Sequence, residues 1–159
     1  MYSNLERYLN DHLLGSAGAV DLIETLARSS AGTSDETFFL NLKSKVEEER
    51  ELVHGLLAAL GKSQSKILEV MGNLTAKGGR LKLLWEGTDS GELGIFEALE
   101  ILSLGIGGKR SLWLMLEKIA PAIPEWAGTD FTALATNAQE QLYAVETRRI
   151  TAGEGALLS

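Results

Sequence analysis

Two glutamates, Glu49 and Glu146, are the residues of this sequence best placed to do chemistry inside a folded core. Each falls on a stripe of apolar residues that recur at three- and four-residue steps, so each is expected on the buried side of a helix. Buried carboxylates serve as metal ligands or as halves of ion pairs. A Glu-x-x-His metal motif needs histidine three residues later, where the sequence has Leu52 and Arg149. Because arginine stays protonated and repels a cation, the pattern predicts ion pairing and no bound metal.

A complete Glu-x-x-His motif occurs elsewhere, at Glu51 and His54. At about 100° per residue, however, Glu51 points away from Val53 and the rest of the apolar stripe. We interpret Glu51 as surface charge, because a three-residue match is easily reached by chance in a segment this rich in glutamate.

Six polar side chains are predicted to share the interior of the protein. The first predicted helix places His12 on its apolar stripe, and the third places Arg110 there, beside Ser103. With the second and third helices parallel, counting about 1.5 Å per residue brings most of the six to a similar depth. Two carboxylates and two guanidiniums can pair, and arginines with a histidine also suit a small acidic ligand. The predicted ligand-binding residues are His12, Glu49, Arg110, Gln139, Glu146 and Arg149.

Glycine-rich segments lie inside two of the predicted helices, GSAGA at Gly15–Ala19 and GIGG at Gly105–Gly108. Glycine inside a helix costs about 1 kcal/mol relative to alanine, so these positions need a physical reason. One reason is close packing between helices, which we favour. The other is functional, either room for a ligand beside His12 and Arg110 or a local bulge in the third helix.

Four long stretches with helical periodicity must position these residues. Thr33 and Glu36 have the spacing of a capping box, and Gly61 stands where a glycine C-cap belongs. Pro121 and Pro124 prevent the third helix from continuing. The predicted helices run from about Ser3 to Ser29, from the Thr33 cap to about Leu60, from Asp89 or Glu92 to about Ala120, and from Thr129 or Asp130 to about Thr151, with a frayed tail after Thr151.

Two connections of different length decide how these helices are arranged. The first two helices are joined by a short loop, so we expect them to be antiparallel neighbours. Residues 62–88 form a much longer second connection, in which Ile67 to Leu74 fit a short extra helix. That length permits a crossover from one end of a bundle to the other. The composition shows no break, so residues 1–159 are predicted to form one all-α domain, a four-helix bundle.

The third predicted helix is apolar on two faces, and a four-helix bundle can cover only one of them. The face directed at the bundle core consists of Ile95, Leu99, Leu102, Ile106 and Trp113. The second face is predicted to pack against the second connection or against another copy of the chain in a homodimer. Its residues are Ile101, Leu104, Leu112, Met115 and Ile119.

The composition narrows the functional classes. The chain has no cysteine, which excludes disulfides, thiolate nucleophiles and cysteine-bound metal centres. Its net charge of −7 disfavours nucleic-acid binding. No segment approaches the roughly 18 uninterrupted apolar residues of a membrane span, and the N-terminus has no apolar stretch of signal-peptide type. We therefore expect a cytoplasmic protein with neither a nucleic-acid nor a membrane partner.

The helix lengths, the long second connection and the inward Glu49 and Glu146 resemble the ferritin-like superfamily. The resemblance covers almost the whole chain. It implies a bundle in which two helices each supply a glutamate and the other two each supply Glu-x-x-His. This sequence keeps two of those carboxylates, a degenerate di-iron site, which favours a non-enzymatic binding or structural role without a cofactor. The alternative is a divergent di-metal oxidoreductase using iron or manganese, with Glu49, Glu146, His12 and Glu100 as ligands.

Overall fold

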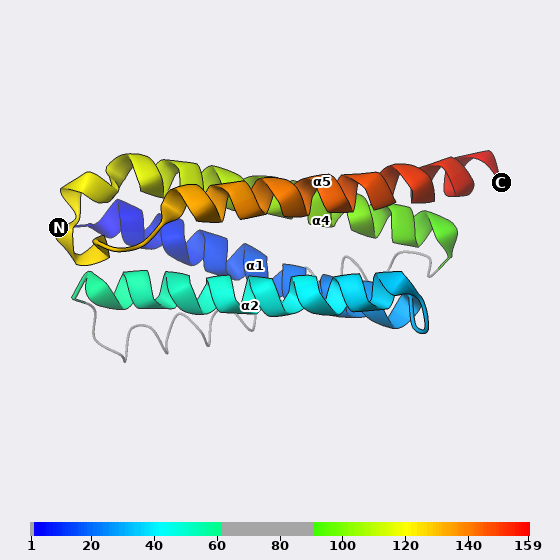
Figure 1. Cartoon of the computed structure of the whole chain (residues 1–159), viewed down its shortest axis with the longest axis horizontal. Helices are drawn as coiled ribbons and strands as arrows, with labels where there is room; N and C mark the ends of the chain where they lie inside the picture. The colour runs from blue at the N-terminus through cyan, green and yellow to red at the C-terminus, as the bar shows by residue number, and fades with distance from the viewer. Residues whose placement is uncertain (1, 62–90) are drawn as a thin grey trace.

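The computed structural model describes residues 2–61 and 91–159, most of which lie in four long helices (Figure 1). These ranges contain no β-strand, so the prediction of an all-α fold is confirmed for them. None of their helices is long and apolar enough to cross a membrane. The predicted short helix at Ile67–Leu74 and the predicted Asp89 cap lie outside the described residues. The elements are α1 (Ser3–Ser29), α2 (Ser34–Ala59), α4 (Glu92–Ile119), the 3-10 turns η1 (Ala120–Ala122) and η2 (Pro124–Trp126), and α5 (Phe131–Leu158).

Capping residues that the sequence indicated hold both ends of α2. The Thr33 hydroxyl accepts a hydrogen bond from the Asp35 N–H at 3.2 Å, and the Glu36 carboxylate accepts one from the Gly32 N–H at 2.7 Å. These two bonds fix the turn that precedes the helix. At the other end, Gly61 has a φ of +81°, the left-handed conformation expected of a glycine C-cap.

The turn between α4 and α5 also follows the sequence signals. α4 ends at Ile119, shortly before Pro121, and two short 3-10 turns reverse the chain. Asp130 then caps α5, because its carboxylate accepts a hydrogen bond from the Ala133 N–H at 2.9 Å.

The C-terminal end of α5 differs from the prediction. The helix continues to Leu158, so the expected end near Thr151 and the frayed tail are wrong. α5 continues in helical conformation through Gly153, which is buried. A Cβ at this glycine would lie 2.8 Å from Cε2 of Phe96 on α4, so glycine fits there without displacing that ring.

The four helices form two antiparallel hairpins, α1 with α2 and α4 with α5, and α1 contacts α4 between them (Figure 1). α2 ends at the end of the bundle where α5 begins, whereas α4 begins at the opposite end (Figure 1). α2 and α4 therefore run in the same direction, an arrangement that the length of the second connection permits.

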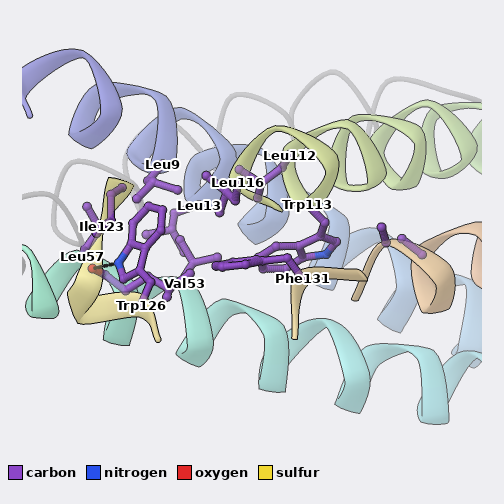
Figure 2. Packing of buried hydrophobic residues seen from close by; sticks show 13 residues of the cluster. Leu9, Leu13, Val53, Leu57, Leu112, Trp113, Leu116, Ile123, Trp126 and Phe131 are labelled. Atoms are coloured by element: carbon purple, nitrogen blue, oxygen red, sulfur yellow. Dashed lines mark hydrogen bonds between the residues drawn. The ribbon is translucent and has the colours of Figure 1, made fainter. Parts of the chain in front are cut away.

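Apolar side chains pack into two clusters, one toward each end of the bundle. In the cluster of Figure 2, the Trp126 Nε1 donates a hydrogen bond to the Leu56 carbonyl at 3.0 Å. That cluster consists of Leu9, Leu13, Val53, Leu56, Leu57, Leu112, Trp113, Leu116, Ile123, Trp126, Phe131, Ala135 and Ala138. The other consists of Leu22, Ile23, Leu26, Ala27, Phe39, Leu42, Val46, Ala98, Leu99, Leu102, Ile106 and Val145.

The second apolar face predicted for α4 is largely exposed. Ile101, Leu104 and Met115 are 45%, 74% and 51% exposed. Leu112 is buried instead, because it lies next to Trp113 at the edge of the core face. The homodimer expected from this face stays a prediction.

Candidate functional site

A buried ion pair between Glu49 and Lys109 lies in the middle of the bundle. Glu49, on α2, is 9% exposed, and its Oε2 lies 2.5 Å from Nζ of Lys109 on α4. Lys109 also donates a hydrogen bond to Oε1 of Gln141 on α5, so one ammonium group joins three helices. Burial lowers the pKa of Lys109, and the Glu49 carboxylate partly offsets this effect. Glu49 faces inward as predicted, but its cationic partner is a lysine rather than an arginine.

Lys109 was not among the residues predicted from the sequence, although a signal for it exists. It lies three residues after Ile106 and four before Trp113, which places it on the core face of α4. Arg110, which was predicted there, is half-buried and makes no hydrogen bond or ion pair with any residue in the described ranges. The two neighbours flank the same stripe, and the backbone path places Lys109 opposite Glu49.

Gln139 was predicted on the inward stripe of α5, but its side chain is exposed. The buried stripe of this helix passes through Ala138 and Val145. Gln139 and Gln141 flank that stripe on opposite sides, and Gln141 lies on the side that faces Lys109. The expected inward position of Gln139 is therefore wrong.

Glu146 and Arg149 form a second ion pair, nearer the surface. Nε and Nη2 of Arg149 donate to the Glu146 carboxylate at 2.9 and 2.8 Å, and the Ser103 hydroxyl donates to the same carboxylate. Arg149 also lies 3.9 Å from Glu100. The hydrogen bonds from Arg149, and then from Ser103, lower the pKa of Glu146. The Glu146 side chain is 36% exposed, against 11% for Glu49, so the two carboxylates lie in different environments.

The six predicted residues therefore do not converge into one network. Arg149 follows Glu146 by three residues on the same helix, so it closes on that carboxylate locally instead of reaching the middle of the bundle. Glu49 is left to pair with Lys109. His12 lies near the Glu49–Lys109 pair, beside a cavity that all three residues line.

The cavity has a volume of about 250 Å³ and lies between α1, α2 and α4. Three glycines line it: Gly15, Gly105 and Gly108. Beyond the backbone of its own helix, a Cβ added at any of them would meet nothing within 4 Å. Close helix packing, the explanation we favoured, is therefore wrong at these positions. The apolar wall is made by Leu13, Ala19, Val46, Val53, Leu102, Ile106, Leu112 and Trp113.

The polar groups at the edge of the cavity are largely engaged with the protein itself. Nη1 of Arg50 donates hydrogen bonds to the Leu13 carbonyl at 2.8 Å and to the Ser16 hydroxyl at 2.6 Å. His12 is half-buried, and burial lowers its pKa although Asp11 partly offsets this. Its imidazole is therefore mainly neutral near pH 7. Asp11 is exposed, as are Gly15 and Gly105, so the cavity reaches the surface between α1 and α4.

Trp113, unlike Arg50, has a hydrogen-bond donor that is not engaged with the protein. The residue is 1% exposed and lines the cavity, and its Nε1–H has no hydrogen-bond acceptor in the part of the chain that the structure describes. Figure 2 shows the indole nitrogen on the edge of the ring that faces away from Trp126. Trp126 marks the end of the bundle remote from the cavity. A buried donor is thus left without a partner at the cavity wall, which is uncommon in folded proteins.

Metal binding has little support from the donor groups. Within residues 2–61 and 91–159, no three His, Asp or Glu side chains gather in a group that fits a metal ion. Lys109 and Arg149 hold the oxygens of Glu49 and Glu146 that a metal would need. The arrangement is better suited to enclosing a small molecule than to coordinating a cation.

Comparison of the chain with protein-family models, curated proteins and solved structures finds no match. The function is therefore inferred from the geometry of the cavity and its surroundings. The main elements of this geometry are an apolar cavity with an opening, an ion pair beside it, and one unpaired donor on its wall.

Proposed function

We propose that this protein is a non-enzymatic binding protein that holds a small, largely apolar molecule in the cavity between α1, α2 and α4. The observation that carries the proposal is the cavity itself, lined by Gly15, Gly105 and Gly108. Close-packed cores leave few voids larger than a water molecule. The cavity has a volume of about 250 Å³, just below the 300–1,000 Å³ typical of sites for drug-sized ligands, so the bound molecule is expected to be smaller than a drug-sized ligand.

The charged groups around the cavity support binding rather than catalysis. Lys109 is held by Glu49, and Arg50 is held by α1, so neither cation is placed to transfer a proton to a bound molecule. The same pairing argues against the small acidic ligand expected from the sequence. A ligand carboxylate would have to compete with Glu49 for Lys109. Displacing one buried carboxylate by another would add little binding free energy.

The ferritin-like relationship and the di-metal oxidoreductase remain the rival proposal. The parallel direction of α2 and α4 supports a ferritin-like arrangement (Figure 1). The metal chemistry is less well supported, because iron or manganese would have to displace Lys109 and Arg149 from the two carboxylates. Stoichiometric iron or manganese in protein expressed with both metals available, lost in the Glu49→Gln/Glu146→Gln variant, would establish that rival and overturn ours.

A pair of glycine substitutions tests the cavity directly. Gly108 lines the cavity and Gly107 does not, although both lie on α4 and both have open space around an added Cβ. Gly108→Leu should fill the cavity, whereas Gly107→Leu should leave it open. Toluene should raise the unfolding temperature of the wild type and of Gly107→Leu, because a ligand that binds only the folded state stabilises it. The Gly108→Leu protein should show no such shift.

Circular dichroism of both variants checks that they fold. An unchanged unfolding temperature of the wild type across the solubility range of toluene would overturn the proposal. An equal shift in both leucine variants would overturn it as well, since binding would then occur somewhere other than the cavity.

A further inference from the structure

We infer that the ligand is a small neutral molecule whose one hydrogen-bond acceptor receives the Trp113 Nε1–H. This inference rests on the proposed function and adds the chemical class of the ligand. The class consists of compact rings or chains that carry a single carbonyl or ether oxygen.

Two buried tryptophans differ in the hydrogen bonding of their indole N–H groups. Trp126 and Trp113 are 2% and 1% exposed. The Trp126 Nε1 donates to the Leu56 carbonyl at 3.0 Å, whereas the Trp113 Nε1 has no acceptor among the described residues. Buried indole N–H groups ordinarily find a partner, because an unpaired buried donor loses its hydrogen bond to water without replacement. A bound acceptor would supply the partner that Trp113 lacks.

The position of the Trp113 indole relative to the cavity supports the same ligand class. On α4, the cavity lining runs from Leu102 to Trp113, so the cavity lies on the side of Trp113 away from Leu116 and Ile123. The indole nitrogen lies on that side of the ring in Figure 2. Nε1 itself has less than 1 Å² of accessible surface, so an acceptor inside the cavity reaches the N–H after a small shift of the neighbouring side chains, and the apolar wall can cover the rest of the molecule.

The charges around the cavity favour a neutral ligand. Among the described residues, the ionised side chains that line the cavity are those of Asp11, Glu49, Arg50 and Lys109, two of each sign. The lowered pKa of His12 keeps its imidazole mainly neutral near pH 7. The lining therefore has no net charge that would attract an ion. Arg50 and Lys109 already donate hydrogen bonds to the protein. Among the fully buried donors of the described lining residues, the Trp113 N–H is the one without an acceptor, and an indole N–H donates without carrying charge.

The test compares two probes of nearly the same shape, acetophenone and ethylbenzene, on the full-length protein. Tryptophan labelled with ¹⁵N gives one indole N–H signal for each of the three tryptophans, and the Trp113→Phe variant identifies that of Trp113. Acetophenone should move the Trp113 signal downfield and leave the Trp126 signal in place. The ratio of acetophenone affinity to ethylbenzene affinity should fall about fivefold in Trp113→Phe, the loss expected for one neutral hydrogen bond.

The possible results separate this inference from the proposed function. If the affinity ratio is the same in the wild type and in Trp113→Phe, the inference is overturned and the binding cavity stands. If neither probe binds the wild type, both are overturned. Benzoate binding more tightly than acetophenone would overturn the neutral class. If Trp113→Phe does not fold, Trp85→Phe and Trp126→Phe identify the other two indole signals, and the remaining wild-type signal must still move with acetophenone.

Discussion

The end of the bundle in Figure 2 and the middle of the bundle solve the packing problem in opposite ways. At the end, Trp126 and Phe131 fill the space between the helices, with ring centroids 5.9 Å apart. In the middle, Gly15, Gly105 and Gly108 leave space that no side chain fills. Each of these glycines costs about 1 kcal/mol relative to alanine in a helix. These three positions therefore give up helix stability and leave open the cavity that the proposed binding function requires.

The charged groups repeat this contrast. Among the described residues, Glu49 is the one ionisable residue that is buried, and it lies in the middle, paired with Lys109. A buried ion pair is weak evidence for stability, because removing two charges from water costs about as much as their attraction returns. The cavity therefore weakens the middle relative to the end while the ion pair adds little, and substitutions in the two regions should differ in size and in sign.

The largest effect is expected at the filled end. Trp126→Ala should lower the free energy of unfolding by about 4 kcal/mol, because it removes a buried ring and leaves a cavity. Trp126→Phe keeps most of the ring and loses the hydrogen bond to the Leu56 carbonyl, so it should cost much less. Urea unfolding measures both values. A cost for Trp126→Ala no larger than that of Leu104→Ala, a truncation on the exposed face of α4, would contradict this account of the end.

The next effect concerns the ion pair in the middle. Lys109→Met should destabilise by about 3 kcal/mol, because the buried Glu49 carboxylate loses its counter-charge. Adding Glu49→Gln should restore most of that loss, since no charge then remains to be paired.

Arg149→Ala is the matched control for Lys109→Met. Arg149→Ala also removes the cation of an ion pair with a glutamate. Because the partner Glu146 is more exposed than Glu49, the unfolding midpoint should shift much less than in Lys109→Met. Equal shifts for Lys109→Met and Arg149→Ala would show that burial does not distinguish the two pairs.

Much of the fold was readable from the sequence because its signals are local. The cap at Thr33, the glycine at Gly61 and the prolines after Ile119 each act on their own helix end, and each was predicted. The end of α5 was not predicted, because Gly153 owes its role to contact with Phe96, a residue on another helix. A glycine required by packing and a glycine that ends a helix look the same in one sequence.

The site was predictable only in part, for a related reason. Periodicity placed Glu49 inside, but it cannot decide between Lys109 and Arg110, which flank one stripe, or between Gln139 and Gln141, which flank another. That choice depends on which edge of the helix meets a neighbour. Room for a ligand was one explanation for the glycines, but close packing was favoured over it, and only the packing of three helices decides between them.

A smaller effect, of opposite sign, is expected from filling the glycine positions with alanine. Gly107→Ala and Gly108→Ala should each raise the free energy of unfolding by about 0.5–1 kcal/mol, because both added methyl groups enter open space. Gly153→Ala should not stabilise, since its methyl group would meet Phe96. Thermal unfolding measures all three. Destabilisation by Gly108→Ala would mean that its surroundings are already filled.

The smallest effect is a dependence of stability on pH that comes from the two histidines. Burial, the main cause in both, lowers the pKa of His12 and of His54 below the 6.5 of an exposed imidazole, while Asp11 and Glu51 partly offset the shift. As the pH falls below 6.5, the unfolded chain therefore takes up protons that the folded chain resists. Stability should fall with falling pH in that window.

The carboxyl of Glu146 has the same sign but a lower range. Its folded pKa is lowered from 4.5, so the stability that it contributes is present above 4.5 and is lost only at more acidic pH. Urea midpoints measured from about pH 7.5 to about pH 5.5 therefore isolate the histidines. His12→Gln should flatten part of this decline, and His12→Gln/His54→Gln should flatten most of it. If the double variant loses stability as steeply as the wild type, the decline comes from other groups, and the imidazole at the cavity is not held in its neutral form by burial.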